Sequence, residues 1–423
     1  MTKHEALKKY FGYDEFRPSQ DTVIDSLLSG RDVLGVMPTG AGKSVCFQIP
    51  ALILPGVTIV VSPLISLMKD QVAGLRKSDI PVAFINSSLT SLQYKEVLRR
   101  IAAGQYKIIY VAPERLNTAD FLRFATEIQL SLIAVDEAHC VSQWGQDFRP
   151  SYLRIAEFIG KLKTRPVIGA FTATATNDVK ADVIRFLKLQ NPMSLTTGFD
   201  RPNLFFGVEK PKNKSKRFHE FIAERSGMCG VVYCSTRKAV DTVTAELRRR
   251  GISAGRYHAG LEDIERRVSQ DNFIQNNISV IVATNAFGMG IDKPDVRYVI
   301  HYNMPKNLEN YYQEAGRAGR DGKPSECVLL FADDDIRTSE FFIEKSGENE
   351  GLTEKERRKV QRQDIKRLDS MIRYCEITSC QRAYILAYFG EKQKGNCGYC
   401  SNCLKPSFWK KLFSNYIDSQ ITL

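Results

Sequence analysis

A glycine-rich segment near the N-terminus has the composition of a loop that binds phosphate groups. The segment, Val36-Met-Pro-Thr-Gly-Ala-Gly-Lys-Ser44, follows a short apolar run and precedes a stretch that favours a helix. Glycines let backbone N–H groups crowd around phosphate oxygens, and the start of a helix adds its dipole. Lys43 would reach the β- and γ-phosphates of a nucleoside triphosphate, and Ser44 would ligate Mg²⁺. The predicted phosphate contacts are Thr39, Gly40, Gly42, Lys43 and Ser44.

The loop alone leaves a chance glycine-rich turn open, because Met37 stands where the full pattern has glycine. A second motif, Asp136-Glu-Ala-His139, directly follows another apolar run. Asp136 would hold Mg²⁺, directly or through water, and Glu137 would polarise the attacking water. Acidic residues that suit a helix dipole are the alternative. Because both motifs lie at strand ends, where parallel sheets bind ligands, we favour a site for nucleotide hydrolysis.

Two arginines in the second half of the chain could complete such a site. Arg317 and Arg320 are three residues apart and would share one face of a helix. Their planar forks match the charge that a γ-phosphate carries in the transition state. A solvated basic helix face is the alternative. The glycines between them, Gly316 and Gly319, favour a close approach of the backbone instead.

Four of the ten cysteines lie close together near the C-terminus: Cys380, Cys397, Cys400 and Cys403. Zn²⁺ favours four tetrahedral thiolates, and four protein ligands indicate a structural rather than a catalytic centre. We therefore predict bound zinc. Disulfides are the first alternative, which a cytosolic setting opposes, and an iron–sulfur cluster is the second. The other six cysteines are scattered, as expected of small core residues.

The elements that would position these residues alternate between apolar β-branched runs and polar, helix-like stretches. The first series of runs covers residues 32–37, 57–61, 107–111, 132–135 and 166–171. The pattern restarts after residue 205, with runs at 230–234, 280–283, 298–301 and 326–331. Such alternation predicts two parallel sheets covered on both faces. Past Glu340 it stops, and we expect a charged helix over 354–375 and a second helix from about Ser379.

The overall composition favours a soluble protein with a polyanionic partner. The 423 residues carry a net charge of +12, and more than half of this excess lies after residue 351. Lysines and arginines near phosphates release condensed counterions, which favours nucleic acid. No apolar run is long enough to cross a bilayer, and the N-terminus lacks the apolar middle of a secretory signal. We expect a cytoplasmic protein, associated with the nucleoid in bacteria, or a nuclear one in eukaryotes.

Taken in this order, these segments resemble those of superfamily 2 helicases, specifically the RecQ family, over about residues 5–404. The resemblance implies two tandem RecA-like domains (1–204 and 205–340), a helical zinc-binding module (341–406) and a basic aromatic tail (407–423). Further segments that match the family are 62–71, 112–115, 171–175, 233–237, 257–261 and 283–292. In the family they line the DNA track or join it to the ATP cleft.

The resemblance also implies roles for single residues. Residues 11–20 resemble the adenine-reading segment of the family, in which Tyr13 would stack on the base, Gln20 would bond its edge and Arg17 would assist. By the same resemblance, Arg320 is the arginine finger and Arg317 is a second contact to the γ-phosphate.

Residues 138–150 resemble the aromatic-rich loop with which the family senses single-stranded DNA. Trp144 and Phe148 offer ring faces for base stacking, worth about 1–3 kcal/mol each. Arg149 adds charge, and His139 is a further predicted nucleic-acid contact. Ordinary core aromatics are the alternative interpretation. The loop departs from the family at Gln146, where histidine is common, which bears on how strongly DNA is coupled to the ATP site.

The resemblance implies an ATP-dependent DNA helicase that moves 3′-to-5′ on single-stranded DNA and unwinds duplexes in recombination and repair, with Mg²⁺ and Zn²⁺. The expected partners are single-stranded and partly duplex DNA, with a single-stranded-DNA-binding protein or a topoisomerase as further candidates, and the chain is expected to be a monomer. From the length of the stretch after Cys403 we expect no winged-helix domain, which is common in the family, within these 423 residues. Two alternatives stay open: an RNA helicase, and a nucleotide-switched DNA-binding or annealing protein with weak unwinding.

Overall fold

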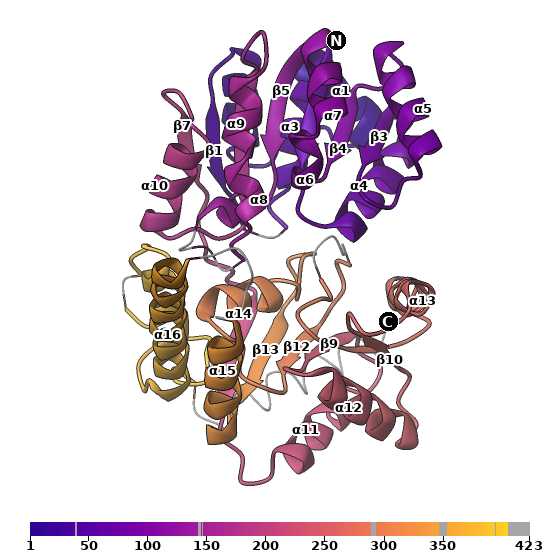
Figure 1. Cartoon of the computed structure of the whole chain (residues 1–423). Helices are drawn as coiled ribbons and strands as arrows, with labels where there is room; N and C mark the ends of the chain where they lie inside the picture. The colour runs from indigo at the N-terminus through magenta and orange to yellow at the C-terminus, as the bar shows by residue number, and fades with distance from the viewer. Residues whose placement is uncertain are drawn as a thin grey trace. The chain divides into compact units, whose positions relative to one another are not determined.

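The computed structural model describes residues 1–38, 40–142, 145, 147–288, 293–346, 353–393 and 395–404. These residues form two compact units, Met1–Phe199 and Asp200–Leu423. Each unit has its own parallel sheet (Figure 1). Each unit also has its own apolar core. The predicted α/β fold class, with two parallel-sheet domains and a helical region that carries the cysteine cluster, is confirmed.

The sheet of the first unit has seven parallel strands in the order β3-β4-β2-β5-β6-β1-β7. The central strands are buried on both faces, which explains why they appear in the sequence as continuous apolar runs. The strands are β1 (Val33–Val36), β2 (Val57–Val61), β3 (Val82–Ile85), β4 (Ile108–Val111), β5 (Leu130–Val135), β6 (Val167–Thr172) and β7 (Met193–Thr196).

The order of these strands brings three carboxyl ends together. β5, β6 and β1 are neighbours and run in the same direction, with Val135 opposite Ala170 and Val36 opposite Thr172. The loop after β1 and the two carboxylates after β5 therefore lie at one edge of the sheet.

The helices of the first unit connect the strands and cover the sheet. They are α1 (Lys3–Phe11), α2 (Gln20–Leu28), α3 (Lys43–Ile53), α4 (Ile65–Lys77), α5 (Ser91–Ala102), α6 (Pro113–Leu116), α7 (Ala119–Glu127), η1 (Ala138–Val141), α8 (Pro150–Leu153), α9 (Ile155–Gly160) and α10 (Asn177–Phe186). Helix α1 shows how the sequence specifies such an element. Thr2 and Glu5 form a reciprocal capping box at its start, and Gly12 ends it in a left-handed conformation.

The sheet of the second unit has six parallel strands in the order β10-β11-β9-β12-β13-β8. Its strands are β8 (Leu204–Glu209), β9 (Gly230–Tyr233), β10 (Ala254–Tyr257), β11 (Val280–Ala283), β12 (Tyr298–His301) and β13 (Ser325–Leu330). Its helices are α11 (Lys214–Ala223), α12 (Arg237–Arg249), α13 (Asp263–Ile274), α14 (Leu308–Ala315), α15 (Asp333–Ser346), α16 (Glu354–Glu376) and α17 (Gln381–Tyr388). The helices predicted over 354–375 and from about Ser379 correspond to α16 and α17.

The C-terminal segment closes the open edge of this second sheet. β8 is an edge strand, and an unpaired edge invites association with other chains. Here the Ser401 amide donates to the Phe206 carbonyl (2.9 Å), and Cys400 forms a β-bridge with Phe206. The Arg382 guanidinium donates to the Asp200 carboxylate (2.6 Å) and to the Leu204 carbonyl (2.5 Å). The cysteine-bearing segment is thus part of the second unit.

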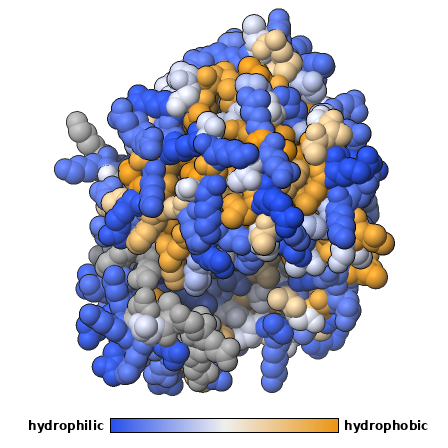
Figure 2. All heavy atoms as spheres, turned by 45° about the horizontal axis from the view of Figure 1, so that its top comes forward, coloured by the Kyte–Doolittle hydropathy of each residue, from blue (hydrophilic) through white to orange (hydrophobic). Residues whose placement is uncertain are grey.

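Polar side chains lie over most of the molecular face drawn in Figure 2, with apolar groups visible between them. Large apolar side chains that are strongly exposed include Leu92 and Ile264. Among the described residues, none of the helices has the length and apolar character needed to cross a membrane.

Candidate active site

The glycine-rich loop has the backbone geometry of a phosphate cradle. β1 ends at Val36, and helix α3 begins at Lys43 with Gly42 as its N-cap. Gly40 and Gly42 have φ angles of 88° and 80°, which favour glycine. A Cβ atom on Gly42 would also overlap the side-chain amide of Gln20. Lys43 and Ser44 therefore start the helix directly after the loop, whereas Thr39 lies outside the described residues.

The segment predicted to read adenine packs against this loop. Gln20 is buried, and its side-chain amide donates to the Gly42 carbonyl (3.1 Å) while its Oε1 accepts from the Arg17 amide (2.9 Å). The Arg17 guanidinium donates to the Gly40 carbonyl. Tyr13 is 57% exposed, as stacking on a base would require. The structure brings Arg17 and Gln20 to the loop, and the contacts of all three with a base stay a prediction.

The two carboxylates lie at the end of β5, which β6 separates from β1, and they are almost buried. Asp136 and Glu137 are 9% and 8% exposed. The Asp136 Oδ1 atom accepts from the Glu137 amide (3.0 Å), and the Tyr152 hydroxyl donates to the Asp136 carbonyl (3.0 Å). Glu137 has a φ angle of 46°, which is strained for a residue with a side chain and is typical of functional positions.

The electrostatics of this pair suit a bound cation. Burial, and then the neighbouring Glu137 carboxylate, raise the pKa of Asp136 to about 6, while Lys43 acts in the opposite direction. Two adjacent carboxylates that disfavour each other's ionisation are stabilised by a divalent ion. Asp136 and Ser44 offer the oxygen ligands that Mg²⁺ prefers, so the residues fit this ion.

The predicted arginines belong to the second unit and follow helix α14. Arg317 is 7% exposed, and its guanidinium donates to the Gly288 carbonyl. A Cβ atom on Gly288 would overlap that guanidinium, so glycine is required there. Arg320 is partly exposed. Their approach to a γ-phosphate bound at Lys43 stays a prediction.

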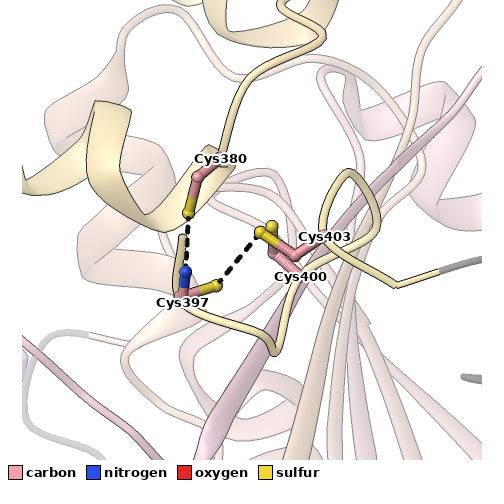
Figure 3. A group of neighbouring side chains, drawn as sticks. All are labelled: Cys380, Cys397, Cys400 and Cys403. Atoms are coloured by element: carbon pink, nitrogen blue, oxygen red, sulfur yellow. Dashed lines mark hydrogen bonds between the residues drawn. The ribbon is translucent and has the colours of Figure 1, made fainter. Parts of the chain in front are cut away.

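The four clustered cysteines converge from two segments. Cys380 is the N-cap of α17, and Cys397, Cys400 and Cys403 come from the following loop (Figure 3). All four sulfur atoms lie within 4.8 Å of one another, and those of Cys397 and Cys403 are 3.9 Å apart. Tetrahedral zinc with bonds of about 2.3 Å separates its sulfur ligands by about 3.8 Å. All ten cysteines are free, so the geometry fits zinc and gives no support to disulfides.

Backbone groups prepare this cysteine centre for thiolates. The amides of Ala383 and Cys397 both donate to the Cys380 sulfur (3.4 Å each), and the Tyr399 amide donates to the Cys397 sulfur (3.2 Å). Hydrogen bonding between the thiols lowers the pKa of Cys400 and raises that of Cys397, and burial raises the pKa of Cys403, so a metal ion must displace the protons that these two thiols keep. Thiolate is the form that binds a metal ion.

Comparison with known proteins places this geometry in a family. Three family models match the chain: DEAD/DEAH box helicase over residues 17–182, helicase conserved C-terminal domain over 213–322, and RecQ zinc-binding over 333–404. The ATP-dependent DNA helicase RecQ of Bacillus subtilis is 47% identical over 398 residues, which cover 94% of this chain and 66% of that protein. The putative ATP-dependent RNA helicase R290 of Acanthamoeba polyphaga mimivirus is 41% identical over 401 residues, which cover 94% of this chain and 71% of that protein. This chain belongs to the RecQ family.

Solved structures support the fold of this RecQ family member. The helicase MrfA bound to DNA has a TM-score of 0.66 at 18% identity, over 94% of this chain and 60% of that one. Yeast Dbp5 bound to RNA and ADP BeF3 has a TM-score of 0.64 at 17% identity, over 87% of this chain and 97% of that one. The chain spans about two thirds of the Bacillus relative and of the Haemophilus influenzae RecQ helicase, to which it is 40% identical over 99% of its own length.

The described part of the aromatic-rich loop of this RecQ chain is anchored beside the carboxylates. Phe148 is half-buried, and the Arg149 guanidinium donates to the Pro63 carbonyl (2.8 Å) and to the Asp147 carboxylate (2.9 Å). Trp144 and Gln146 lie outside the described residues. DNA contacts by Phe148 and Arg149 stay a prediction.

His139 lies within the site rather than on an open surface. It is 3% exposed, and its Nδ1 atom is 2.8 Å from the Thr172 hydroxyl and 3.3 Å from the Glu137 carboxylate. The nucleic-acid contact predicted for His139 is untested, but the structure gives the ring a place between Glu137 and the end of β6. The sequence did not predict the contact between Thr172 and His139, because the contact depends on β5 and β6 being neighbours.

Proposed function

We propose that this chain is an ATP-dependent DNA helicase of the RecQ type, which moves 3′-to-5′ on single-stranded DNA and opens duplexes. The observation that carries the proposal is the meeting of the phosphate loop with Asp136 and Glu137 at one sheet edge, in a chain that also has the RecQ cysteine centre. The names of the bacterial relatives specify DNA, and the name of the viral relative specifies RNA.

The residues suggest how hydrolysis would proceed. The loop and Lys43 would bind the β- and γ-phosphates, and Ser44 and Asp136 would hold the magnesium ion that neutralises charge on them. Glu137 would orient the attacking water and accept its proton. His139, placed between Glu137 and Thr172, would keep that carboxylate in position. Arg320, assisted by Arg317, would stabilise the charge of the transition state.

The deciding experiment is strand separation of tailed duplexes by the 423-residue chain. Duplexes of DNA and of RNA, each with a 3′ or a 5′ single-stranded tail, are incubated with ATP and Mg²⁺. We expect opening of the 3′-tailed DNA duplex alone and no opening by the Lys43→Ala variant. Faster opening of the RNA duplex would support an RNA helicase, and ATP turnover without opening would support a DNA clamp or an annealing protein.

We propose further that the chain acts as a monomer, in the cytoplasm at the nucleoid or in a nucleus. A single-stranded-DNA-binding protein and a topoisomerase are the candidate protein partners. Sedimentation with and without a tailed duplex tests whether the chain is a monomer, and co-sedimentation with each purified partner tests whether the two bind.

A further inference from the structure

Helix α14 is short, and two candidate catalytic arginines follow it. It spans eight residues, Leu308–Ala315, and Arg317 lies two residues beyond its end. So short a helix has little stability of its own, so packing must fix its position. On one side, the His301 ring meets the Glu314 carboxylate at 2.9 Å and ties the helix to β12.

On another side, two tyrosine hydroxyls from the helices near the cysteine centre hold α14. The Tyr388 hydroxyl, at the end of α17, donates to the Glu309 carboxylate (2.7 Å), which is 5% exposed. The Tyr374 hydroxyl, in α16, donates to the Tyr311 hydroxyl (3.0 Å), and both tyrosines are fully buried. Buried polar groups are costly without a partner, so these bonds specify one position of α14.

Helix α17 is fixed by the cysteine centre. Cys380 caps the N-terminus of α17, and its sulfur accepts from the amides of Ala383 and Cys397 (3.4 Å each). Arg382, in the first turn of α17, donates to the Arg201 carbonyl (2.6 Å) at the start of the second unit. One end of α17 is therefore set by the cysteines, and its other end reaches α14 through Tyr388.

We propose that the zinc module positions the arginine-bearing end of α14, and that Tyr388 and Tyr374 are positioning residues for ATP hydrolysis. The inference rests on the proposed function, because it requires that Arg317 and Arg320 act on the γ-phosphate. Its consequence is that the module controls the rate of turnover as well as the fold of the second unit.

The first test is Tyr388→Phe, with Tyr384→Phe as its matched control. Tyr384 lies one turn earlier in α17, and its hydroxyl donates to the Ser370 carbonyl (3.1 Å) in α16 rather than to α14. We expect Tyr388→Phe to lower the kcat of DNA-stimulated ATP hydrolysis about tenfold, as expected when a catalytic group is slightly misplaced. The KM for ATP, the zinc content and the melting temperature should match those of Tyr384→Phe. Equal kcat values for the two variants would overturn the inference.

A double-mutant cycle separates positioning from general destabilisation. If Tyr388 acts through the arginine, its removal should have no further effect in an Arg320→Lys background, whereas independent structural damage would give additive losses. Tyr374→Phe, which removes the other hydroxyl contact, should behave like Tyr388→Phe in both backgrounds. Additive losses would overturn the inference.

Different results would reject the catalytic role of Arg320 and the positioning role of Tyr388. Normal ATP hydrolysis by Arg320→Lys and Arg320→Ala would remove the arginine from the proposed function, whatever Tyr388 does. Slow hydrolysis by both arginine variants, together with normal hydrolysis by Tyr388→Phe and Tyr374→Phe, would leave the proposed function standing and reject the positioning role alone.

Discussion

Asp136 is a residue that destabilises the folded protein but is suited to binding a magnesium ion. Its pKa in the folded protein is about 6, against an ordinary value of 3.8, because it is buried and lies beside Glu137. Because folding raises the pKa of this carboxyl, the free energy of unfolding falls as pH rises from 3.8 to about 6. The full loss of stability is present above pH 6. A bound magnesium ion would offset that cost.

We therefore predict that Asp136→Asn stabilises the nucleotide-free protein at pH 8, by up to about 3 kcal/mol. The gain should be roughly half as large at pH 5, because the wild-type carboxyl is then largely protonated in the folded state. Urea denaturation at both pH values measures it, with the exposed Asp120→Asn as the control. The variant should also lose the stabilisation that ATP with Mg²⁺ gives the wild type. A destabilised variant at pH 8 would contradict this account.

Glu137 is the proposed general base, and its replacement tests that role. Glu137→Gln keeps the shape of the side chain and removes the base, so kcat for ATP hydrolysis should fall by about 10²–10⁴-fold. Single-stranded DNA binding should persist, because the loop and the aromatic segment are unchanged. Turnover assays and fluorescence anisotropy of labelled DNA measure the two effects, and normal turnover would refute the assignment of the base.

Some of the site residues could be predicted from the sequence and others could not. The phosphate loop and the carboxylates were identifiable, because their spacing and their place after apolar runs have a physical meaning. The contact of His139 with Thr172 was not, since it depends on β5 and β6 being neighbours. Strand order in a parallel sheet is set by long connections that leave no local trace in the sequence.

At the scale of elements, the apolar runs identified every inner strand of both sheets and none of the edge strands. β3, β7, β10 and β8 lie at the four edges, and none was among the predicted runs. Inner strands are buried along nearly their whole length and are mostly apolar, because both faces are covered. β7 alternates between half-buried and exposed residues, and β10 contains no β-branched residue. The sequence signal is therefore weak for β7 and β10, whereas β3 and β8 are mostly buried and apolar and were missed without such a reason.

A buried ion pair joins the end of α11 to β13. The Arg225 guanidinium meets the Glu326 carboxylate at 2.6 Å, and the two are 4% and 2% exposed. Burial raises the pKa of Glu326 to about 7, although Arg225 opposes the shift. Arg225→Met would leave an unpaired buried carboxylate, which costs about 3–5 kcal/mol.

The expected loss in Arg225→Met depends on pH. Without the arginine, the pKa of Glu326 should rise further, so the folded variant keeps a proton that the folded wild type releases between pH 6 and pH 8. The loss of stability should therefore grow over that range. Urea denaturation at the two pH values checks this sign. The double variant Arg225→Met with Glu326→Gln should recover much of the loss, and a loss independent of pH would exclude the mechanism.

At the scale of the whole molecule, the two units have separate sheets and separate cores. The zinc module belongs to the second unit, where Ser401 and Cys400 cover β8. A change confined to the cysteines should therefore destabilise one half of the chain more than the other. We predict that Cys403→Ser, or a strong chelator, lowers the unfolding temperature of the second unit and leaves that of the first nearly unchanged.

Differential scanning calorimetry should then show two unfolding transitions that lie further apart in temperature than those of the wild type. Affinity for an ATP analogue at the Lys43 site should remain within about threefold of the wild type, because the loop and carboxylates lie in the first unit. Cys229→Ser, which changes a partly buried cysteine outside the cluster, is the control and should leave both transitions in place. Exposure of β8 should also make the zinc-free protein associate at high concentration, as an uncovered strand edge does. A single transition that shifts as a whole on zinc loss would show that the two units unfold together and would reject their thermodynamic independence.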